Sequence, residues 1–410
     1  MAWAALAALT ALTACDPAAT RDVRGERENR RYQAAMADYK AGRVDAAASG
    51  FEDAAREDPS NAEARFQLGC LLHDAKLRRP GGHRQVVRLV RVVRVAADNP
   101  GLALHDMADC PARREHGKGI RGKVRVKVLI TGGKGMLGRT LQRELSGNEI
   151  VVADLPEWDM TDADGFMAKT LAEKPDVVVH CAAMTKVDDC ETNRDLAFRL
   201  NEEGSRNVAL AAKAAGARLI AISTDYVFSG DPPHEPWAWD ETDVPRPQTV
   251  YGASKLAGEQ MIQMILPDAA ILRIAWLYGS GGPSFVHTMA RLGAQDGAPL
   301  KVVNDQRGNP TSTKTVADVI RFLLGRPDVS GIIHGTCEES CTWYELTVEL
   351  FRLLGLKREV VPCTTEEFPR PAPRPHNSAL RKSVLNLLGY RTPDWRSALA
   401  EFAKEEFKSS

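Results

Sequence analysis

Three features that define other classes of protein are missing from this sequence. Lysine plus arginine and aspartate plus glutamate both number 54, so the chain lacks the basic surplus typical of nucleic-acid binding. The eight cysteines and nine histidines are scattered, without the Cys-x-x-Cys pairs of a zinc site, and we predict buried thiols and no protein-built metal site. No apolar run reaches the roughly 18 residues that span a membrane. Nucleic acid, zinc and a membrane are therefore not expected as partners.

The first positive signal is a glycine-rich segment that directly follows an apolar run at residues 128–130. That run is typical of a buried parallel strand, and the apolar spacing of residues 136–141 is typical of a helix. The glycines between them suit a tight turn, close approach of the backbone to a pyrophosphate, and close contact of helix and strand. The helix N-terminus offers N–H groups to phosphates. We therefore expect a dinucleotide to contact Gly132, Gly135, Met136, Leu137 and Gly138.

A carboxylate ends the next expected strand, at residues 149–154. Asp154 lies sixteen residues after the last glycine of the loop, where an acid accepts hydrogen bonds from the adenosine ribose. A loop or helix-capping aspartate is the alternative interpretation. Asp159 and Met160 are expected to flank the adenine. Asp154 favours NADH, whereas Lys134 would suit the 2′-phosphate of NADPH, so the sequence leaves that choice open.

Two further apolar runs, at residues 175–183 and 218–222, predict parallel strands. The first ends in small residues, as expected where the backbone passes beside a cofactor. The second places Thr224 just beyond its carboxyl end, and ligands of open α/β sheets bind outside the carboxyl ends of strands. Thr224 can therefore donate a hydrogen bond to a substrate oxygen. A capping hydroxyl is the alternative.

Residues 251–255 read YGASK and pair a phenol with an ammonium. On a helix, residues i and i+4 share a face, so Tyr251 and Lys255 can point into one site. A free tyrosine has a pKa near ~10, and a neighbouring ammonium lowers that pKa, which suits proton exchange with an alcohol or carbonyl oxygen. Alone, this spacing is often a chance surface pair. Its position after the glycine loop and Thr224 makes it a strong signal.

Taken in order, the segments TGGKGMLG, AAMTKVDDCE, STDYVFSG and YGASK resemble the extended short-chain dehydrogenase/reductases that act on nucleotide sugars. Within them, the chain is most similar to the dTDP-4-dehydrorhamnose reductase family. Further segments support that branch, at residues 272–279, 304–311, 342–344 and 374–378. The resemblance covers residues 124–410.

The resemblance implies a reaction with named roles. NADPH or NADH would reduce the C4 keto group of a nucleotide-linked 6-deoxy sugar, converting dTDP-4-dehydro-L-rhamnose to dTDP-L-rhamnose. Tyr251 would protonate the developing alkoxide, and Thr224 would polarise the carbonyl. Lys255 would hold the nicotinamide ribose and adjust the pKa of Tyr251. These three residues are the predicted catalytic group.

The resemblance also assigns residues to the two ligands. Ala182, Ala183 and Thr185 would line the cofactor. The substrate site would comprise Val187, Asp188, Asp225, Tyr226, Trp276, Arg374 and Asn377. Arg273 is a further candidate for the substrate diphosphate, with a structural ion pair as the alternative. Family members commonly carry asparagine where this chain has Ser284, which puts one polar substrate contact in doubt.

Other functions share these motifs. A nucleotide-sugar epimerase or dehydratase uses the same fold and catalytic group, but keeps its cofactor bound and returns the hydride. A non-catalytic NAD(P)-binding protein, like the regulatory subunit of methionine adenosyltransferase, also resembles the family. The segments at 342–344 and 374–378 favour the reductase, and the intact catalytic group argues against a non-catalytic role. Some relatives use Mg²⁺ at a subunit interface, so Mg²⁺ dependence and a homodimer stay open.

The first 123 residues carry different signals. Residues 1–20 are an apolar leader containing Leu-Thr-Ala-Cys, which resembles a lipoprotein cleavage box without the usual positive start. Residues 28–75 fit a truncated tetratricopeptide helix pair, which would be an interaction scaffold if it folds alone. Residues 76–123 are expected to be a poorly ordered junction or the product of a start-site or frameshift error. Because the reductase needs cytoplasmic cofactor and substrate, we predict a cytoplasmic location.

The alternation of expected strands and helices predicts an α/β fold. Residues 124–410 should form a Rossmann-type, doubly wound parallel sheet with helices on both faces. A small C-terminal substrate-binding lobe should come mainly from residues 280–310 and 335–380. A proline-rich turn in the second range would supply loop-borne contacts.

Overall fold

The computed structural model of the chain describes residues 30–40, 46, 49, 50, 53, 125–232 and 237–407. The chain divides into two compact units, Met1–Pro111 and Ala112–Ser410. In the first unit the described residues include helix α3 (Arg30–Lys40), inside the predicted repeat. Most of that repeat, the whole apolar leader and the whole junction lie outside the described residues. These three assignments therefore remain predictions.

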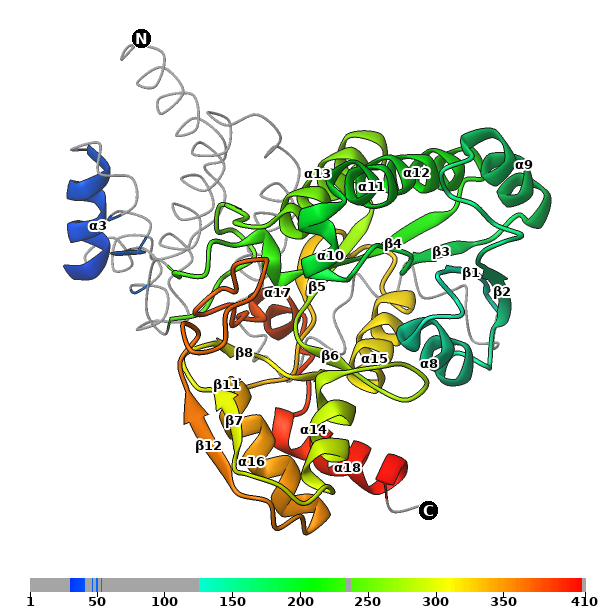
Figure 1. Ribbon diagram of the computed structural model, residues 1–410. Helices are drawn as coiled ribbons and strands as arrows, with labels where there is room; N and C mark the ends of the chain where they lie inside the picture. The colour runs from blue at the N-terminus through cyan, green and yellow to red at the C-terminus, as the bar shows by residue number, and fades with distance from the viewer. Residues whose placement is uncertain are drawn as a thin grey trace. The chain divides into compact units, whose positions relative to one another are not determined.

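A six-stranded sheet forms the centre of the second unit (Figure 1). All neighbouring strands are parallel, and the strand order reverses between β1 and β3, the kind of position where open α/β sheets bind ligands. The strands in spatial order are β10 (Gly331–His334), β5 (Ala270–Ile274), β4 (Arg218–Thr224), β3 (Val177–His180), β1 (Lys127–Thr131) and β2 (Glu149–Ala153). The inner strands are buried on both faces, which explains their continuous apolar runs.

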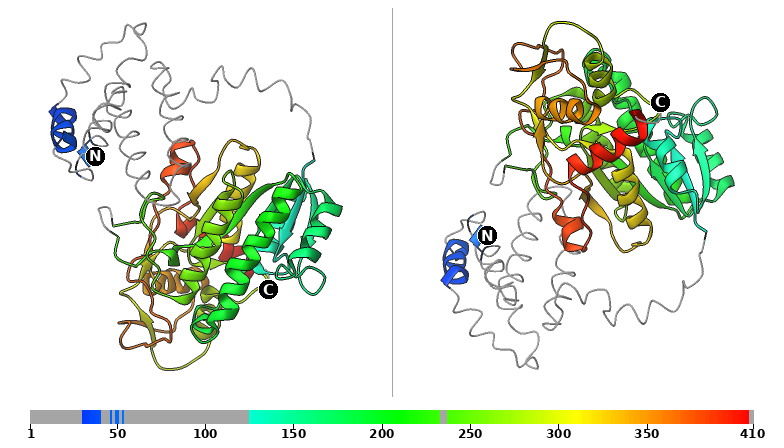
Figure 2. Two further views of the ribbon diagram at one scale, coloured as in Figure 1. Left: turned by 90° about the horizontal axis from the view of Figure 1, so that it is seen from above. Right: turned by 90° about the horizontal axis from the view of Figure 1, so that it is seen from below.

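Helices cover both faces of this sheet (Figure 2). Successive residues of a strand point to opposite faces, so Val128 and Ile130 of β1 pack with α8 and α15, whereas Leu129 packs with α9, α12 and α13. The bounds are α8 (Met136–Glu144), α15 (Thr313–Leu324), α9 (Ala163–Glu173), α12 (Gly204–Ala214) and α13 (Val250–Ile265). The predicted doubly wound fold is confirmed.

A smaller lobe with its own apolar core is built from segments that lie before and after β10 in the chain. Its buried residues include Tyr278, Leu350 and Trp395. Its main elements are α14 (Phe285–Gly293), β7 (Leu300–Val303), α16 (Trp343–Leu354), β12 (Val360–Cys363) and α18 (Trp395–Phe407). Strands β7 and β12 pair in parallel, so their carboxyl ends meet at one edge. Most of these elements fall within the two ranges assigned above to the substrate lobe, and α18 adds a C-terminal helix to them.

Short elements complete the second unit. They are α10 (Val187–Thr192), α11 (Arg194–Phe198), a π-helical turn (Arg199–Glu203), a 3₁₀ turn (Asp225–Val227), β6 (Leu277–Tyr278), β8 (Arg307–Gly308), β9 (Thr311–Ser312), β11 (Cys341–Thr342) and α17 (Ser383–Leu387). Of the helices that the structure describes, none has the length and apolar character needed to cross a membrane.

Candidate active site

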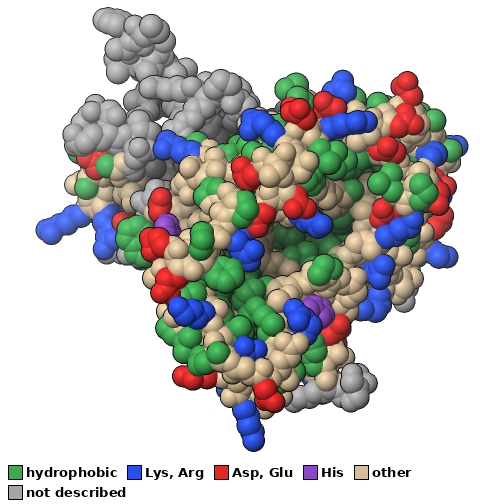
Figure 3. Space-filling model, viewed as in Figure 1, with side chains coloured by type: hydrophobic (Ala, Val, Ile, Leu, Met, Phe, Trp, Pro, Cys, Tyr) green, Lys and Arg blue, Asp and Glu red, His purple; other side chains and the backbone are tan. Residues whose placement is uncertain are grey.

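A cavity of about 730 Å³ opens at the carboxyl ends of the central strands, and Figure 3 shows a hollow with apolar walls on this face of the molecule. It collects residues that the sequence placed in separate motifs. The predicted residues that line it are Gly132, Gly135, Met136, Leu137, Gly138, Asp154, Asp159, Met160, Ala182, Ala183, Thr185, Val187, Thr224, Asp225, Tyr226, Tyr251, Lys255 and Trp276. One continuous cavity thus joins the predicted cofactor residues to the predicted catalytic group.

The glycine loop leaves no room for side chains. Gly132 has a left-handed backbone (φ +66°), and a β-carbon there would lie 2.8 Å from the Ala182 nitrogen. A β-carbon on Gly138 would lie 2.4 Å from the Gly132 carbonyl oxygen. Helix α8 begins directly after Gly135, which makes no side-chain capping bond. This bare loop and the positive end of α8 fit a dinucleotide pyrophosphate.

Asp154 occupies the end of β2 and is held by the backbone. Its Oδ2 accepts a hydrogen bond from the Lys134 N–H at 2.7 Å, and its Oδ1 accepts one from the Leu155 N–H at 2.8 Å. A carboxylate has further lone pairs, so both oxygens can still accept from a ribose hydroxyl. The Lys134 ammonium donates to the Leu155 carbonyl and lies 3.5 Å from Glu157. The only lysine of the loop is therefore already engaged by oxygens.

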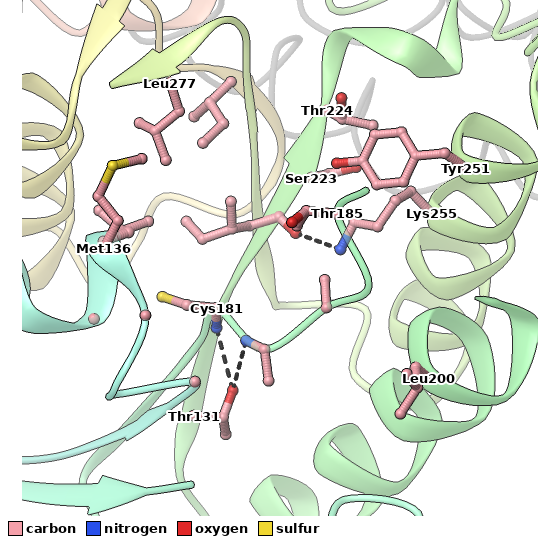
Figure 4. A pocket seen from close by; sticks show the side chains of 18 of the residues that line it. Thr131, Met136, Cys181, Thr185, Leu200, Ser223, Thr224, Tyr251, Lys255 and Leu277 are labelled. Carbon is pink, nitrogen blue, oxygen red and sulfur yellow. Dashed lines mark hydrogen bonds between the residues drawn. The ribbon is translucent and has the colours of Figure 1, made fainter. Parts of the chain in front are cut away.

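Thr131, which the sequence analysis did not single out, organises the junction of β1 and β3. Its hydroxyl oxygen accepts the N–H groups of Cys181 and Ala182, both at 3.2 Å (Figure 4). The same oxygen lies 2.7 Å from the Nδ1 of His180. Burial lowers the pKa of His180 to about 3, so this ring is neutral. The only sequence signal for Thr131 was its place at the end of a buried strand.

The predicted catalytic side chains meet at one end of the cavity (Figure 4). Helix α13 begins at Val250, where Thr249 caps it by accepting the Gly252 N–H at 3.0 Å. This start places Tyr251 and Lys255 one turn apart on the cavity side. Thr224 ends the adjacent β4 and donates to Asp225 Oδ1 at 3.0 Å. The three residues thus come from two elements fixed by the central sheet.

Burial sets the protonation of this group. It raises the pKa of Tyr251 well above the usual tyrosine value, and a hydrogen bond with Thr224 only partly opposes this. The direction is opposite to the one expected from a neighbouring ammonium, because burial is the largest effect on the pKa of Tyr251. The Lys255 ammonium itself donates to the Ile222 carbonyl at 2.9 Å. Burial also lowers the pKa of Lys255 to about 8, with Glu259 opposing. The protein therefore holds a protonated phenol, which is an acid.

Comparison with known proteins agrees with this geometry. The family model described as RmlD substrate binding domain matches residues 126–407. A dTDP-4-dehydrorhamnose reductase from Streptomyces griseus is 42% identical over 286 residues, which cover 68% of this chain and 93% of that protein. The chain belongs to the dTDP-4-dehydrorhamnose reductase family.

Two further relatives of this reductase family are informative. A protein named probable dTDP-4,6-dihydroxy-2-methyloxan-3-one 4-ketoreductase, from Streptomyces antibioticus, is 45% identical over 67% of this chain and 94% of its own length. A solved dTDP-4-dehydrorhamnose reductase from Bacillus anthracis, in complex with NADP, is 39% identical with a TM-score of 0.66. That comparison covers 69% of this chain and all of the solved chain.

Three residues that the family resemblance assigned to the substrate do not line the cavity. Arg374 donates to Asp188 Oδ2 at 2.8 Å, and the Ala372 N–H donates to Asp188 Oδ1 at 3.1 Å. Asn377 donates to the Trp237 carbonyl at 2.8 Å. These side chains bind one another, the proline-rich loop and the loop at Trp237 in the structure. Their contact with substrate therefore remains a prediction.

Arg273 also lies away from the cavity. Its guanidinium is buried and pairs with Glu259 through a 2.6 Å contact. This is the structural ion pair that was the alternative to a contact with the substrate diphosphate. Ser284, the departure from the family pattern, caps α14 by accepting the His287 N–H at 3.3 Å. The serine thus takes a helix-capping position in this chain.

Trp343 is a cavity residue that sequence reasoning did not place in the site. It lies flat against Trp276, with ring centroids 3.4 Å apart and an angle of 5° between the planes. The segment at 342–344 was a family signal, but nothing local showed that it would meet Trp276. Among the described residues, no group of three or more His, Cys, Asp or Glu side chains could hold a metal ion.

Proposed function

We propose that this chain reduces the C4 keto group of a dTDP-linked 6-deoxy sugar with NADPH or NADH, and that its substrate is dTDP-4-dehydro-L-rhamnose. The convergence of Thr224, Tyr251 and Lys255 at one end of a dinucleotide-sized cavity is the observation that carries this proposal. The family membership supports it, and so does the NADP complex of the Bacillus anthracis relative.

The chemistry follows from the protonation of the site. When bound, NAD(P)H supplies the hydride that reduces the carbonyl carbon. Tyr251, held protonated by burial, donates its proton to the carbonyl oxygen as negative charge develops there. Lys255 holds the nicotinamide ribose, and its positive charge stabilises the phenolate that remains. A high pKa for Tyr251 therefore suits reduction, which consumes a proton.

Thr224 has a second task in this proposal. Its hydroxyl donates to Asp225 in the free protein, and it accepts the Tyr226 N–H at 3.2 Å. To polarise the substrate carbonyl, the hydroxyl must turn from Asp225 to the substrate oxygen. Asp225 then loses one hydrogen bond and can accept a sugar hydroxyl in its place. This exchange accounts for the presence of both residues at the same end of the cavity.

The decisive experiment mixes the full-length chain with enzymatically generated dTDP-4-dehydro-L-rhamnose and NADPH or NADH, while nicotinamide absorbance is followed. We expect substrate-dependent loss of the reduced cofactor, removed by Tyr251→Phe although this variant still binds the cofactor. We expect NADH to be used at the lower KM, because the Asp154 carboxylate opposes a 2′-phosphate and Lys134 is engaged by oxygens. Cofactor binding without any loss of absorbance would contradict this reaction.

A different dTDP-4-keto sugar is the second candidate substrate. The Streptomyces antibioticus relative is named for another dTDP-linked 4-ketoreduction, and it is 45% identical to this chain. Parallel assays with other dTDP-4-keto-deoxy sugars test this alternative. A kcat/KM that is highest for one of them would reassign the sugar but leave the roles of the catalytic group unchanged.

Three further properties belong to the same proposal. The cytoplasm is the proposed location, because the cofactor and a nucleotide sugar are found there. A homodimer is the proposed assembly, which light scattering of the full-length chain would test. Mg²⁺ dependence is tested by repeating the assay and the light scattering with a chelator present.

A further inference from the structure

Trp276 sits at an unusual point of the backbone. Its φ is +46°, the left-handed region that a residue with a β-carbon seldom adopts. Such a conformation persists when the surroundings fix it, and it is often found at functional sites. Trp276 follows β5 by two residues, and Ile274 of β5 pairs in register with Thr224. The indole therefore lines the cavity at its catalytic end.

The Trp276 ring is in close contact with two neighbours. Trp343 lies parallel to it with a centroid separation of 3.4 Å. Gly308 also lies close to the ring, and a β-carbon there would be 2.4 Å from Cε2 of the indole. Two free aromatic rings prefer an offset or edge-to-face arrangement over a full sandwich. The flat stack is thus imposed by what surrounds the pair.

A chain of hydrogen bonds from the lobe fixes the plane of Trp343. Its indole N–H donates to Gln306 Oε1 at 3.1 Å, and the Gln306 amide donates to Thr365 Oγ1 at 2.9 Å. The hydroxyl and N–H of Thr365 both donate to the Asp305 carboxylate, at 2.7 and 2.9 Å. Asp305 and Thr365 each lie two residues beyond the ends of β7 and β12. The small parallel sheet of the lobe is thereby connected to the wall of the cavity.

We propose that Trp343 is a positioning residue for the substrate, acting through Trp276. It holds the Trp276 indole as a flat wall beside the catalytic group, and the hydrogen bonds of Gln306, Thr365 and Asp305 set the plane of that wall. A sugar presents a face of C–H groups that packs against an aromatic surface, so the wall holds the sugar ring to a similar extent before and during its reduction. This role rests on the proposed function and extends it to residues of the lobe.

Three variants of the full-length chain test this role. Trp343→Leu removes the stacked ring, and Trp343→Phe keeps a ring but loses the N–H. Gln306→Leu removes the acceptor of the indole N–H, so that the plane of the Trp343 ring is no longer fixed by a hydrogen bond. Trp237→Phe is the matched control, because it removes an exposed tryptophan from a loop outside the cavity. Four quantities are measured: the circular dichroism couplet of the stacked indoles, the Kd for NADPH, the Kd for dTDP-L-rhamnose, and KM with kcat.

For Trp343→Leu we expect loss of the couplet and about a tenfold rise in both the KM for the keto sugar and the Kd for dTDP-L-rhamnose. The kcat should stay within about twofold, because the wall binds substrate and transition state alike. The Kd for NADPH should not change. Trp343→Phe should restore much of the affinity, and Gln306→Leu should fall between the two.

Several outcomes would overturn the inference. One is a wild-type chain without the couplet, which would mean that the stack does not form. Another is loss of the couplet with unchanged affinity for dTDP-L-rhamnose, which would make Trp343 purely structural. If NADPH binding weakened by the same factor, the indole stack would contact the cofactor and not the sugar. If the wild-type chain shows no turnover, the proposed function fails, but the couplet and the dTDP-L-rhamnose affinities still decide the role of Trp343.

Discussion

The two ends of the cavity are built in different ways. The proposed cofactor end is centred on a loop of small residues that follow one another closely along the chain, such as Gly132 and Gly138. The substrate end combines the ends of β4 and α13 with side chains from the lobe, such as Trp343. The glycine loop of that end is therefore a local property of a strand, a turn and a helix, to which β2 and β3 add residues such as Asp154 and Ala182. The substrate end depends on contacts between distant segments, so it has more freedom to change its specificity.

Lys255 serves both ends in the proposed mechanism, so its loss should have the largest effect. We expect Lys255→Met to lower kcat/KM by about a thousandfold, since it removes the charge that stabilises the Tyr251 phenolate. The Kd for NADPH should rise by about tenfold, because a charged hydrogen bond to the ribose is lost. Stopped-flow kinetics measures turnover and calorimetry measures the Kd for NADPH, so the two effects can be separated on the same protein.

Lys186→Met is the matched control for charge, because Lys186 is an exposed lysine whose ammonium lies 3.5 Å from Asp189 on the surface. It should leave both quantities unchanged. If Lys255→Met lowered turnover without any change in the Kd for NADPH, Lys255 would act only at the substrate end, and the proposed contact with the nicotinamide ribose would be wrong.

Gly138→Ala should damage the cofactor end alone. The added methyl would lie 2.4 Å from the Gly132 carbonyl oxygen and 2.6 Å from the Gly133 Cα, and backbone atoms cannot move aside as a flexible side chain can. We expect the Kd for NADPH to rise by about a hundredfold. Gly147→Ala is the control, since a β-carbon there meets nothing within 4 Å. A normal cofactor Kd in Gly138→Ala would show that the loop adjusts freely.

The pH dependence of the reaction should distinguish the two buried groups of the catalytic end. Burial lowers the pKa of Lys255 to about 8, so its positive charge is present below that pH and lost as the pH rises through it. Burial raises the pKa of Tyr251, so the phenol stays protonated over the same range. We expect kcat/KM to be level near neutral pH and to fall about tenfold per unit above about pH 8. A profile that stays flat to about pH 10 would contradict this assignment.

The sequence was sufficient to predict the features that depend on residues close together in the chain. The apolar runs around Val128 and Ile220 gave the strands, and the glycine spacing gave the turn. The position of Thr224 at a strand end and the i, i+4 spacing of Tyr251 and Lys255 gave three residues that line one cavity. Each of these follows from strand, turn or helix geometry alone.

The lobe was harder to predict because its contacts join distant residues. Asp188 and Arg374 are 186 residues apart, and each was assigned to the substrate without any sign that they bind each other. The stack of Trp276 on Trp343 depends on a left-handed backbone at Trp276 and on the absence of a side chain at the neighbouring Gly308. The raised pKa of Tyr251 depends on burial, which arises only when the chain folds. The spacing of residues along the chain predicts none of these long-range contacts.

The pair of Asp188 and Arg374 gives the smallest expected effect and the sharpest test of the substrate end. Their contact at 2.8 Å fastens the proline-rich loop to α10, and both side chains are mostly buried. If the pair acts only as this fastener, Asp188→Asn and Arg374→Lys should each raise the KM for the sugar about threefold, and the double variant should be no worse than either. NADPH affinity should stay constant, because neither residue reaches the cofactor end.

If Arg374 instead binds the substrate diphosphate directly, Arg374→Lys should raise KM by far more than Asp188→Asn, and the two effects should add. Comparing KM across this cycle therefore determines whether the arginine shapes the substrate end from outside or contacts the substrate itself.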